Sequence, residues 1–292
     1  MTWDLIKHAL LPPGEASSTI TLVYWLVLVL FAGLEFFAPQ FQDLHRGHRW
    51  PTNFGLGLIV MALIPLTPVS ALWATQWAQS HGIGLLNLLG DSWWGFAVIA
   101  TILIQSFASY ATHLLFHKTP WLWRVHRVHH FDTAVDVSTG LRHHPLEMLL
   151  MLIIDVPVAI AFGLVSWALI IYGTADAMFA LFSHANIRLP ASLDRTLRLL
   201  LVTPRIHAVH HSAHKTETDS NYGNVFTIWD RIFGTYCDLR ADSPEAIQFG
   251  LVELRDQRAS DLWWQLKSPI YVMSKPTPEP SARSEPGPIP RY

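Results

Sequence analysis

The chain has 292 residues, of which 51% are hydrophobic and only 14% are charged, and its mean hydropathy is +0.27. Since an average soluble domain has roughly 25% charged residues, this composition excludes a disordered chain and argues against an ordinary soluble protein. The net charge of -2 gives no electrostatic reason to expect a nucleic-acid partner. The single cysteine, Cys237, cannot form an intrachain disulfide or a thiolate cluster, so any metal must have nitrogen or oxygen ligands.

Four apolar segments are long enough to cross a membrane. In chain order they are Ile20–Phe37, Asn53–Ala74, Trp93–Phe116 and the long block Leu146–Ile187. Pro65 and Pro68 interrupt the second segment, and Pro157 and Gly163 break the fourth. The length of the fourth favours a hairpin that enters and leaves the membrane on one side. The segments predict an all-α, integral membrane helical bundle.

The basic residues of the connectors predict the orientation. The second connector, Thr75–Ser92, contains no Lys or Arg, whereas Ala38–Thr52 and Lys118–Pro145 contain several. The positive-inside rule therefore places the second connector outside and the other two in the cytoplasm, together with the part of the chain after Ile187. The N-terminus is then expected outside. The membrane would be the inner or plasma membrane in a bacterium and the endoplasmic reticulum in a eukaryote.

Twelve of the 16 histidines lie between His113 and His214. They form one HxxxH motif, two HxxHH motifs and a lone histidine in the fourth apolar block. Spacings of three and four place imidazoles on one face of a helix. The candidate metal ligands are His113, His117, His126, His129, His130, His184, His207, His210 and His211.

These histidines predict a metal centre made of imidazoles. Imidazole binds Fe, Zn, Cu and Ni well, and eight or nine ligands suit two ions with four or five each. The Glu-x-x-His pattern of soluble di-iron bundles is missing from the clusters. Each motif alone also fits an interface belt or a helix cap, and His184 alone fits a core histidine. All three motifs share one side of the membrane if Leu146–Ile187 crosses it an even number of times.

The residues from Trp93 to Tyr236 resemble the fatty acid hydroxylase/sterol desaturase superfamily. The matching stretches are YATHLLFHKTPWLWRVHRVHH (Tyr110–His130), LRHHPLE (Leu141–Glu147), FSHANI (Phe182–Ile187), TPRIHAVHHSAHKTETDSNYG (Thr203–Gly223) and WDRIFGTY (Trp229–Tyr236). The resemblance implies a membrane-bound, non-haem di-iron oxygenase that hydroxylates or desaturates a lipid with O2. It also implies a separate electron-donor protein and a helical cap on the cytoplasmic side that carries the dimetal site. His184 matches the family's isolated histidine, while His143 is extra and His214 matches nothing.

Several other residues are candidates to bind the metals or to support the ligands, because a ligating imidazole needs a partner on its second ring nitrogen. His144 matches the histidine of the family's RxHP motif, and Asp219, Asn221 and Tyr222 closely follow the last cluster. The other available carboxylates are Asp132, Asp136, Glu147, Glu217 and Asp230. Asp155 and Asp176 lie in or near apolar segments, where a carboxylate suggests a function unless it sits at the shallow end of a helix.

This interpretation divides the chain into four parts. Residues 1–92 form N-terminal spans, 93–240 the catalytic region, 241–274 a C-terminal extension, and 275–292 a Pro/Ser-rich tail expected to be disordered. The expected cofactor is a pair of iron ions, and zinc would replace iron in purified protein because the Irving–Williams order favours it.

The alternative is a membrane protein that binds or transports metal without oxygenase activity. Transporters place their ligands near the bilayer midplane on broken helices, whereas these clusters fall mostly at helix ends. A haem carrier needs single histidines on facing helices, and a zinc peptidase needs an HExxH motif that is missing here. The sequence leaves open the identity of the lipid and the choice between hydroxylation and desaturation.

Overall fold

The computed structural model describes residues 13–42, 45–238 and 247–272. Over these ranges the chain is built from helices and loops, with only isolated β-bridges such as Pro39 to Ile187. The predicted all-α membrane bundle is confirmed. The tail expected to be disordered, 275–292, lies outside the described residues.

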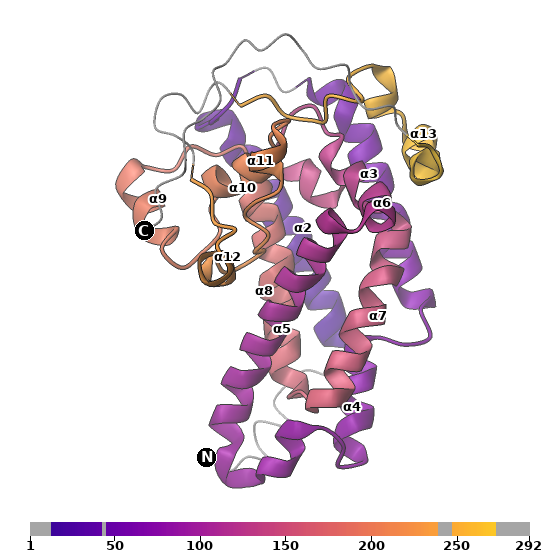
Figure 1. The fold of residues 1–292 in the computed structure, drawn as a ribbon, viewed down its shortest axis with the longest axis vertical. Helices are drawn as coiled ribbons and strands as arrows, with labels where there is room; N and C mark the ends of the chain where they lie inside the picture. Colours follow the sequence, from indigo (N-terminus) through magenta and orange to yellow (C-terminus); the bar gives the residue numbers. More distant parts are fainter. Residues whose placement is uncertain (1–12, 43–44, 239–246, 273–292) are drawn as a thin grey trace.

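Two sets of helices make up the molecule (Figure 1). The long helices that form the bundle are α2 (Pro13–Phe37), α3 (Arg46–Leu63), α4 (Ala71–Ser80), α5 (Trp94–Lys118), α7 (Pro145–Phe162) and α8 (Ser166–His184). The shorter helices gather toward the upper part of Figure 1 and are α6 (Pro120–His130), α9 (Ala191–Leu197), α10 (Pro204–His210), α11 (Lys215–Thr218), α12 (Ile228–Phe233) and α13 (Leu262–Lys267). We call this second set the cap.

Five helical segments among the described residues are long and apolar enough to cross a membrane. They are Thr19–Phe37, Arg46–Leu89, Trp94–Lys118, Pro145–Phe162 and Ser166–His184. Only 11% to 28% of their most apolar stretches is buried inside the protein. The remaining apolar surface is too large to face water, whereas a bilayer covers it at no cost because every helix satisfies its own backbone hydrogen bonds.

The second apolar segment is not one helix. α3 begins before it, at Arg46, and ends at Leu63, where Pro65 enters a short 3-10 turn. The chain then runs extended to Ser70, whose hydroxyl accepts a hydrogen bond from the Trp73 amide and caps α4. The two prolines therefore divide the segment, since proline cannot donate the helical hydrogen bond.

The fourth apolar block forms the expected hairpin, and α7 and α8 are its two arms. The turn falls at Gly163, whose φ of 60° is in the left-handed region. A Cβ at Gly163 would lie 2.7 Å from the carbonyl oxygen of Ile83, so only glycine fits. Pro157 does not break the block and remains inside α7, since a proline removes only one hydrogen bond from a long helix.

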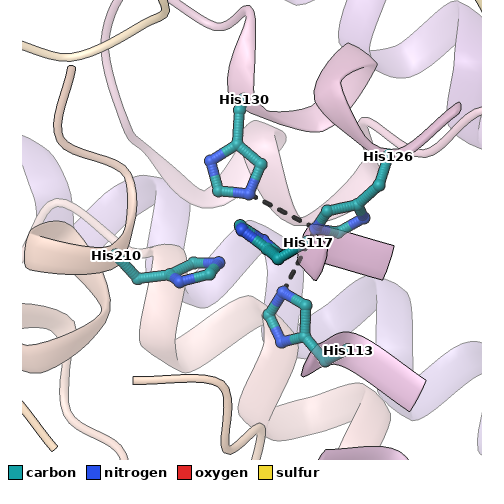
Figure 2. A group of neighbouring side chains, drawn as sticks. All are labelled: His113, His117, His126, His130 and His210. Carbon is teal, nitrogen blue, oxygen red and sulfur yellow. Dashed lines mark hydrogen bonds between the residues drawn. The ribbon is translucent and has the colours of Figure 1, made fainter. Parts of the chain in front are cut away.

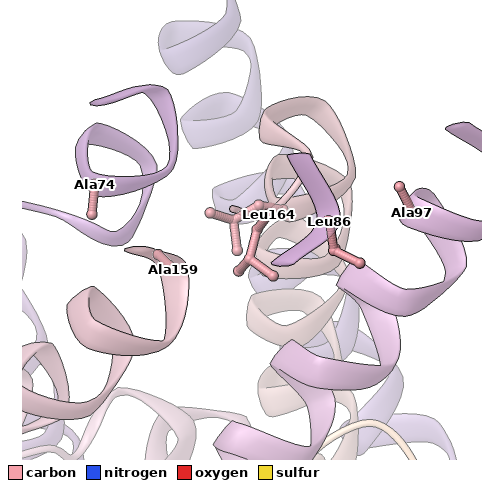
Figure 3. Close-up of a cluster of buried hydrophobic side chains, with 6 residues drawn as sticks. Ala74, Leu86, Ala97, Ala159 and Leu164 are labelled. Carbon is pink, nitrogen blue, oxygen red and sulfur yellow. The ribbon is translucent and has the colours of Figure 1, made fainter. Parts of the chain in front are cut away.

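A small-residue core closes the end of the bundle opposite the cap (Figure 3). Its members are Ala74, Leu86, Ala97, Ala159, Leu164 and Leu169, from α4, α5, α7, α8, the connector between α4 and α5, and the turn between α7 and α8. The Thr75–Ser92 connector therefore lies at the other end of the bundle from the cap (Figure 1). This agrees with the expectation that the two lie on different sides of the membrane; which side is cytoplasmic stays a prediction.

A buried ionic network joins α3 to the loop that follows α6. The Arg49 guanidinium is 1% exposed and pairs with Asp132 and Asp136, and its Nη2 also donates to the Ala134 carbonyl. Burial alone would raise the pKa of Asp132, but Arg49 outweighs this effect and lowers it to about 2. Asn53 donates to the same carboxylate at 2.8 Å. The pairing compensates charges that would otherwise be costly to bury.

Candidate metal centre

All nine histidines singled out in the sequence come together in the structure, in two groups. The five-histidine group comprises His113, His117, His126, His130 and His210. The four-histidine group comprises His129, His184, His207 and His211. Within each group the potential ligand atoms lie within 4.8 Å of one another. Figure 2 shows the rings of the first group converging from α5, α6 and α10.

Each HxxHH motif is divided between the two groups. His126 and His130 of α6 belong to the five-histidine group, while His129 belongs to the four-histidine group. The motif on α10 does the reverse, because His210 alone joins the five-histidine group. Successive residues of a helix point about 100° apart, so the two adjacent histidines of a motif cannot face one point. Each motif therefore serves both groups.

Hydrogen bonds fix the tautomer of five of these rings. The Nδ1 atom donates to a backbone carbonyl in His113 (Tyr222, 2.8 Å), His129 (Arg142, 3.2 Å), His184 (Ala180, 2.6 Å) and His210 (Ser220, 2.7 Å), and to the Glu147 carboxylate in His126 (2.8 Å). Carbonyl and carboxylate oxygens only accept, so each Nδ1 carries the proton. In the neutral ring, Nε2 is then a bare lone pair, which is the state that a metal requires.

These lone pairs face each other at short range. His113 Nε2 lies 3.1 Å from His126 Nε2, and His129 Nε2 lies 3.0 Å from His184 Nε2. Two such lone pairs cannot hydrogen-bond to each other. They repel each other unless a cation lies between them. Two nitrogens about 2.1 Å from one ion and roughly 90–110° apart would be about 3.0–3.4 Å from each other, so the observed spacing fits shared coordination.

Burial keeps the rings neutral and ready to coordinate. Desolvation, reinforced by neighbouring imidazoles, lowers the pKa of the ring in five group members outside the membrane-spanning segments. Those members are His129, His130, His207, His210 and His211, with a value of about 3 for His210. His117 has no hydrogen-bond partner on either ring nitrogen. The donor set therefore fits two metal ions, one in each group.

Glu147, which the sequence offered only as one of several available carboxylates, is the one that touches the groups most directly. It begins α7, is 4% exposed, and accepts hydrogen bonds from His126 Nδ1 and from His143 Nδ1 at 3.2 Å. The His143 ring stacks on that of His129, with centroids 4.5 Å apart. Because Glu147 lies 21 residues after His126, only the fold brings the two together.

Asp219 and Tyr222 lie beside the five-histidine group. An Asp219 oxygen is 3.5 Å from His117 Nδ1 and also pairs with Lys118. The Tyr222 carbonyl accepts from His113, and its ring packs on His113, His117 and His210. Asp230 positions this segment, because its carboxylate accepts from the Tyr222 and Gly223 amides at 2.8 Å.

Three other histidines and Asn221 lie outside both groups. His144 caps α7, with Nδ1 accepting from the Leu146 amide and Nε2 contacting the Leu266 carbonyl. Asn221 binds the backbone of Ile206 and Cys237. His143 contacts Glu147 and His129, and His214 is exposed before α11. The structure thus gives His144 and Asn221 backbone contacts, and it places neither of them in a group.

Fold and site together define a membrane protein with a buried, histidine-rich dimetal site. The model of the family described as fatty acid hydroxylase matches residues 98–235, which carry all nine histidines. This part of the chain is similar to the fatty acid hydroxylase family, and the resemblance noted in the sequence is confirmed. No solved structure matches the chain.

Curated relatives are lipid-modifying enzymes. An ornithine lipid hydroxylase of Rhizobium tropici is 27% identical over 63% of this chain and 50% of its own length. An alkylglycerol monooxygenase of Caenorhabditis elegans is 30% identical over 58% of this chain and 32% of its own length. A cholesterol 25-hydroxylase-like protein of Danio rerio is 26% identical over 60% of this chain and 67% of its own length. The chain thus spans half or less of the length of the first two.

Proposed function

We propose that the protein is a membrane-bound di-iron oxygenase that hydroxylates a lipid C–H bond with O2 and electrons from a separate donor protein. The single observation that carries this proposal is the pair of converging histidine groups whose Nε2 lone pairs face each other. The names of the relatives support it, because all three are hydroxylases or monooxygenases, or resemble one, and act on lipids. They also favour hydroxylation over desaturation.

The reaction has a simple balance. One C–H bond breaks and one C–O bond forms, while the second oxygen atom leaves as water after taking up two electrons and two protons. No side chain is strong enough to remove hydrogen from an alkyl chain, so the bound iron pair supplies the oxidant. In this proposal the electrons come from the separate donor protein.

The residues of this chain hold the centre and exclude water from it. Buried carbonyls and Glu147 keep a proton on Nδ1 and so keep Nε2 available. All the histidines of the four-histidine group are buried, which limits the access of water to the oxidant. The apolar spans would place a lipid chain next to the groups, because α5 and α8 both continue from the membrane into the site.

The cap is proposed to face the cytoplasm, where soluble electron donors are available. The basic connectors support this orientation, since the positive-inside rule places them in the cytoplasm. A metal transporter would hold its ligands near the middle of the bilayer, whereas these groups lie at one end of the bundle. We therefore do not propose a transport function.

Lipid profiling tests the function directly. Cells that express the chain should accumulate a lipid heavier by one oxygen than in cells without it. His211→Ala should abolish this product because it removes a ligand, whereas His81→Ala, a matched change in the exposed connector, should not. A product that has lost two hydrogens would refute hydroxylation in favour of desaturation. An unchanged product from His211→Ala would refute the dimetal mechanism.

A further inference from the structure

A strip of polar side chains lines α5 just below the five-histidine group. Gln105, Ser109 and Thr112 lie within about 60° of one another around this helix. Thr112 is 2% exposed, and its hydroxyl has no hydrogen-bond partner. The buried Oε1 atom of Gln105 has none either. Unpartnered polar groups inside a membrane bundle are costly, so they call for a ligand or a functional reason.

Two carboxylates from the hairpin meet this strip. Gln105 Nε2 donates to Asp155 of α7 over 3.4 Å, and Tyr172 Oη donates to Asp176 of α8 over 3.3 Å. Both aspartates are half-buried rather than sealed in the core. Both also lie near the middle of their helices. They are not at shallow helix ends, where contact with water would explain a carboxylate.

Asn224 completes the polar cluster from the loop before α12. Its Nδ2 donates to Ser109 Oγ at 2.9 Å, and its side chain also hydrogen-bonds to Asp176. Ser109 bonds to Tyr172 in turn. These contacts close a ring of four side chains that includes Asp176, whereas Asp155 keeps a single long hydrogen bond. The cluster is thus held in place but retains acceptor capacity.

No cationic side chain compensates these carboxylates within α5, α7 and α8. The one Lys or Arg on these three described helices is Lys118, at the end of α5, and it pairs with Asp219 at 3.1 Å. Asp155 and Asp176 are also close enough to repel each other. Two carboxylates in an apolar bundle need a donor or a cation from elsewhere.

The cluster is adjacent to the metal centre. Asp176 interacts electrostatically with His143, whose ring stacks on that of His129. Thr112 directly precedes His113 in the chain. A lipid head bound in this cluster would keep the rest of the lipid within reach of the two histidine groups.

We propose that Asp155, Asp176 and Thr112 bind the polar head of the lipid substrate through its hydrogen-bond donors, either hydroxyl or ammonium. This inference rests on the proposed function and narrows the substrate to a lipid whose head enters the bundle, rather than a plain hydrocarbon chain. The aspartates accept from the donors, and the Thr112 hydroxyl gains the partner that it lacks. A lipid without a donor would leave these acceptors unsatisfied.

Binding to purified, metal-loaded protein in detergent tests the proposal without turnover. The probes are three lipids with the same chain: a monoalkylglycerol, its di-O-methyl ether and an alkylammonium. Titration calorimetry should show the wild type binding at least one donor-bearing lipid roughly 10-fold to 100-fold more tightly than the ether, since hydrogen bonds to charged groups are strong. Selectivity for the glycerol assigns a hydroxyl head, and selectivity for the ammonium assigns a cationic head.

Asp155→Asn and Asp176→Asn should each reduce this preference by about 10-fold or more, and Thr112→Val should reduce it less. Ile153→Asn is the matched control, because it places the same amide on α7 at a side chain that is 66% exposed to lipid, and it should bind like the wild type. Metal content shows that each variant is folded. If Asp176→Asn loses its metals, Asp155→Asn and Thr112→Val still decide the matter.

Equal binding of the ether and both donor lipids by the wild type would overturn the inference. So would an unchanged preference in Asp155→Asn and Thr112→Val. These failures are separate from a failure of the proposed function. Oxygen insertion into a lipid without donor selectivity leaves the function standing and removes the head-group site. Donor-selective binding without any oxygenated product supports the site and removes the oxygenase.

Discussion

Replacing Glu147 with glutamine should weaken metal binding in the five-histidine group more than in the four-histidine group. The carboxylate accepts hydrogen bonds from His126 at 2.8 Å and from His143 at 3.2 Å, and both reach the same oxygen, Oε1. A glutamine can keep one oxygen in this place, but it loses the negative charge that makes the His126 ring a stronger ligand. His129 and the rest of the four-histidine group make no hydrogen bond to Glu147 in the described part of the chain.

The expected loss of metal affinity follows from the fact that only one ligand, His126, is affected. Loss of a carboxylate that supports a metal-bound histidine typically lowers metal affinity by about 10–100-fold, or roughly 1.4–2.7 kcal/mol. Competition with a chelator of graded strength measures this change. Wild-type protein should release its two ions together, whereas Glu147→Gln should release one ion at a chelator concentration roughly 10–100-fold lower.

Glu217→Gln is the matched control, because Glu217 is a half-buried carboxylate residue on α11 whose backbone carbonyl accepts a hydrogen bond from the Ser220 hydroxyl. It should release its ions as the wild type does. If Glu147→Gln weakened both ions equally, the division into two groups would be wrong. If it weakened neither, the proposed role of Glu147 in holding the His126 ring would be wrong.

Further expectations concern the metals, the buried ionic network and the orientation. Elemental analysis of purified protein should find close to two ions per chain, with zinc as an acceptable substitute for iron; one ion, or none in folded protein, would contradict the dimetal site. Arg49→Met should lower the free energy of unfolding by roughly 3–5 kcal/mol, because it removes the buried cation that pairs with two buried carboxylates, whereas Arg195→Met on exposed α9 should change it little; equal thermal stability in detergent would refute this. Reporter fusions after Lys118 and after Thr216 should both report the cytoplasm, and opposite sides would contradict the α7–α8 hairpin.

The apolar segments and the histidine spacing were readable from the sequence because both depend on local order. A span of about 20 apolar residues and a histidine repeat of three or four need no knowledge of the partner helix. The hairpin was also predictable, since an overlong apolar block with an internal glycine at Gly163 must turn. Pro157 was misread as part of that break, because a proline signals a helix end but a long membrane helix tolerates one.

The partners that complete the site were not readable. The carbonyl that fixes the His113 tautomer belongs to Tyr222, 109 residues away, and any residue type offers a carbonyl. In the sequence, Arg49 counted only as one of the basic residues that predict the orientation. In the structure it holds the loop between α6 and α7 through Asp132 and Asp136. Among several carboxylates near the clusters, the spacing favoured Asp219, which closely follows the last cluster, over Glu147.

The division of each HxxHH motif shows why the two groups depend on each other. α10 has only seven residues, too few to form a stable helix alone, yet it supplies ligands to both groups. It is held at its start by the segment around Thr203, which donates to Asp194 at 2.8 Å, and at its end by His210 and Asn221. Since each ion would bind a histidine from α10, occupation of one group orders the helix that the other group needs. Metal binding and folding of the cap are therefore coupled, and a change at either group acts on both through α10.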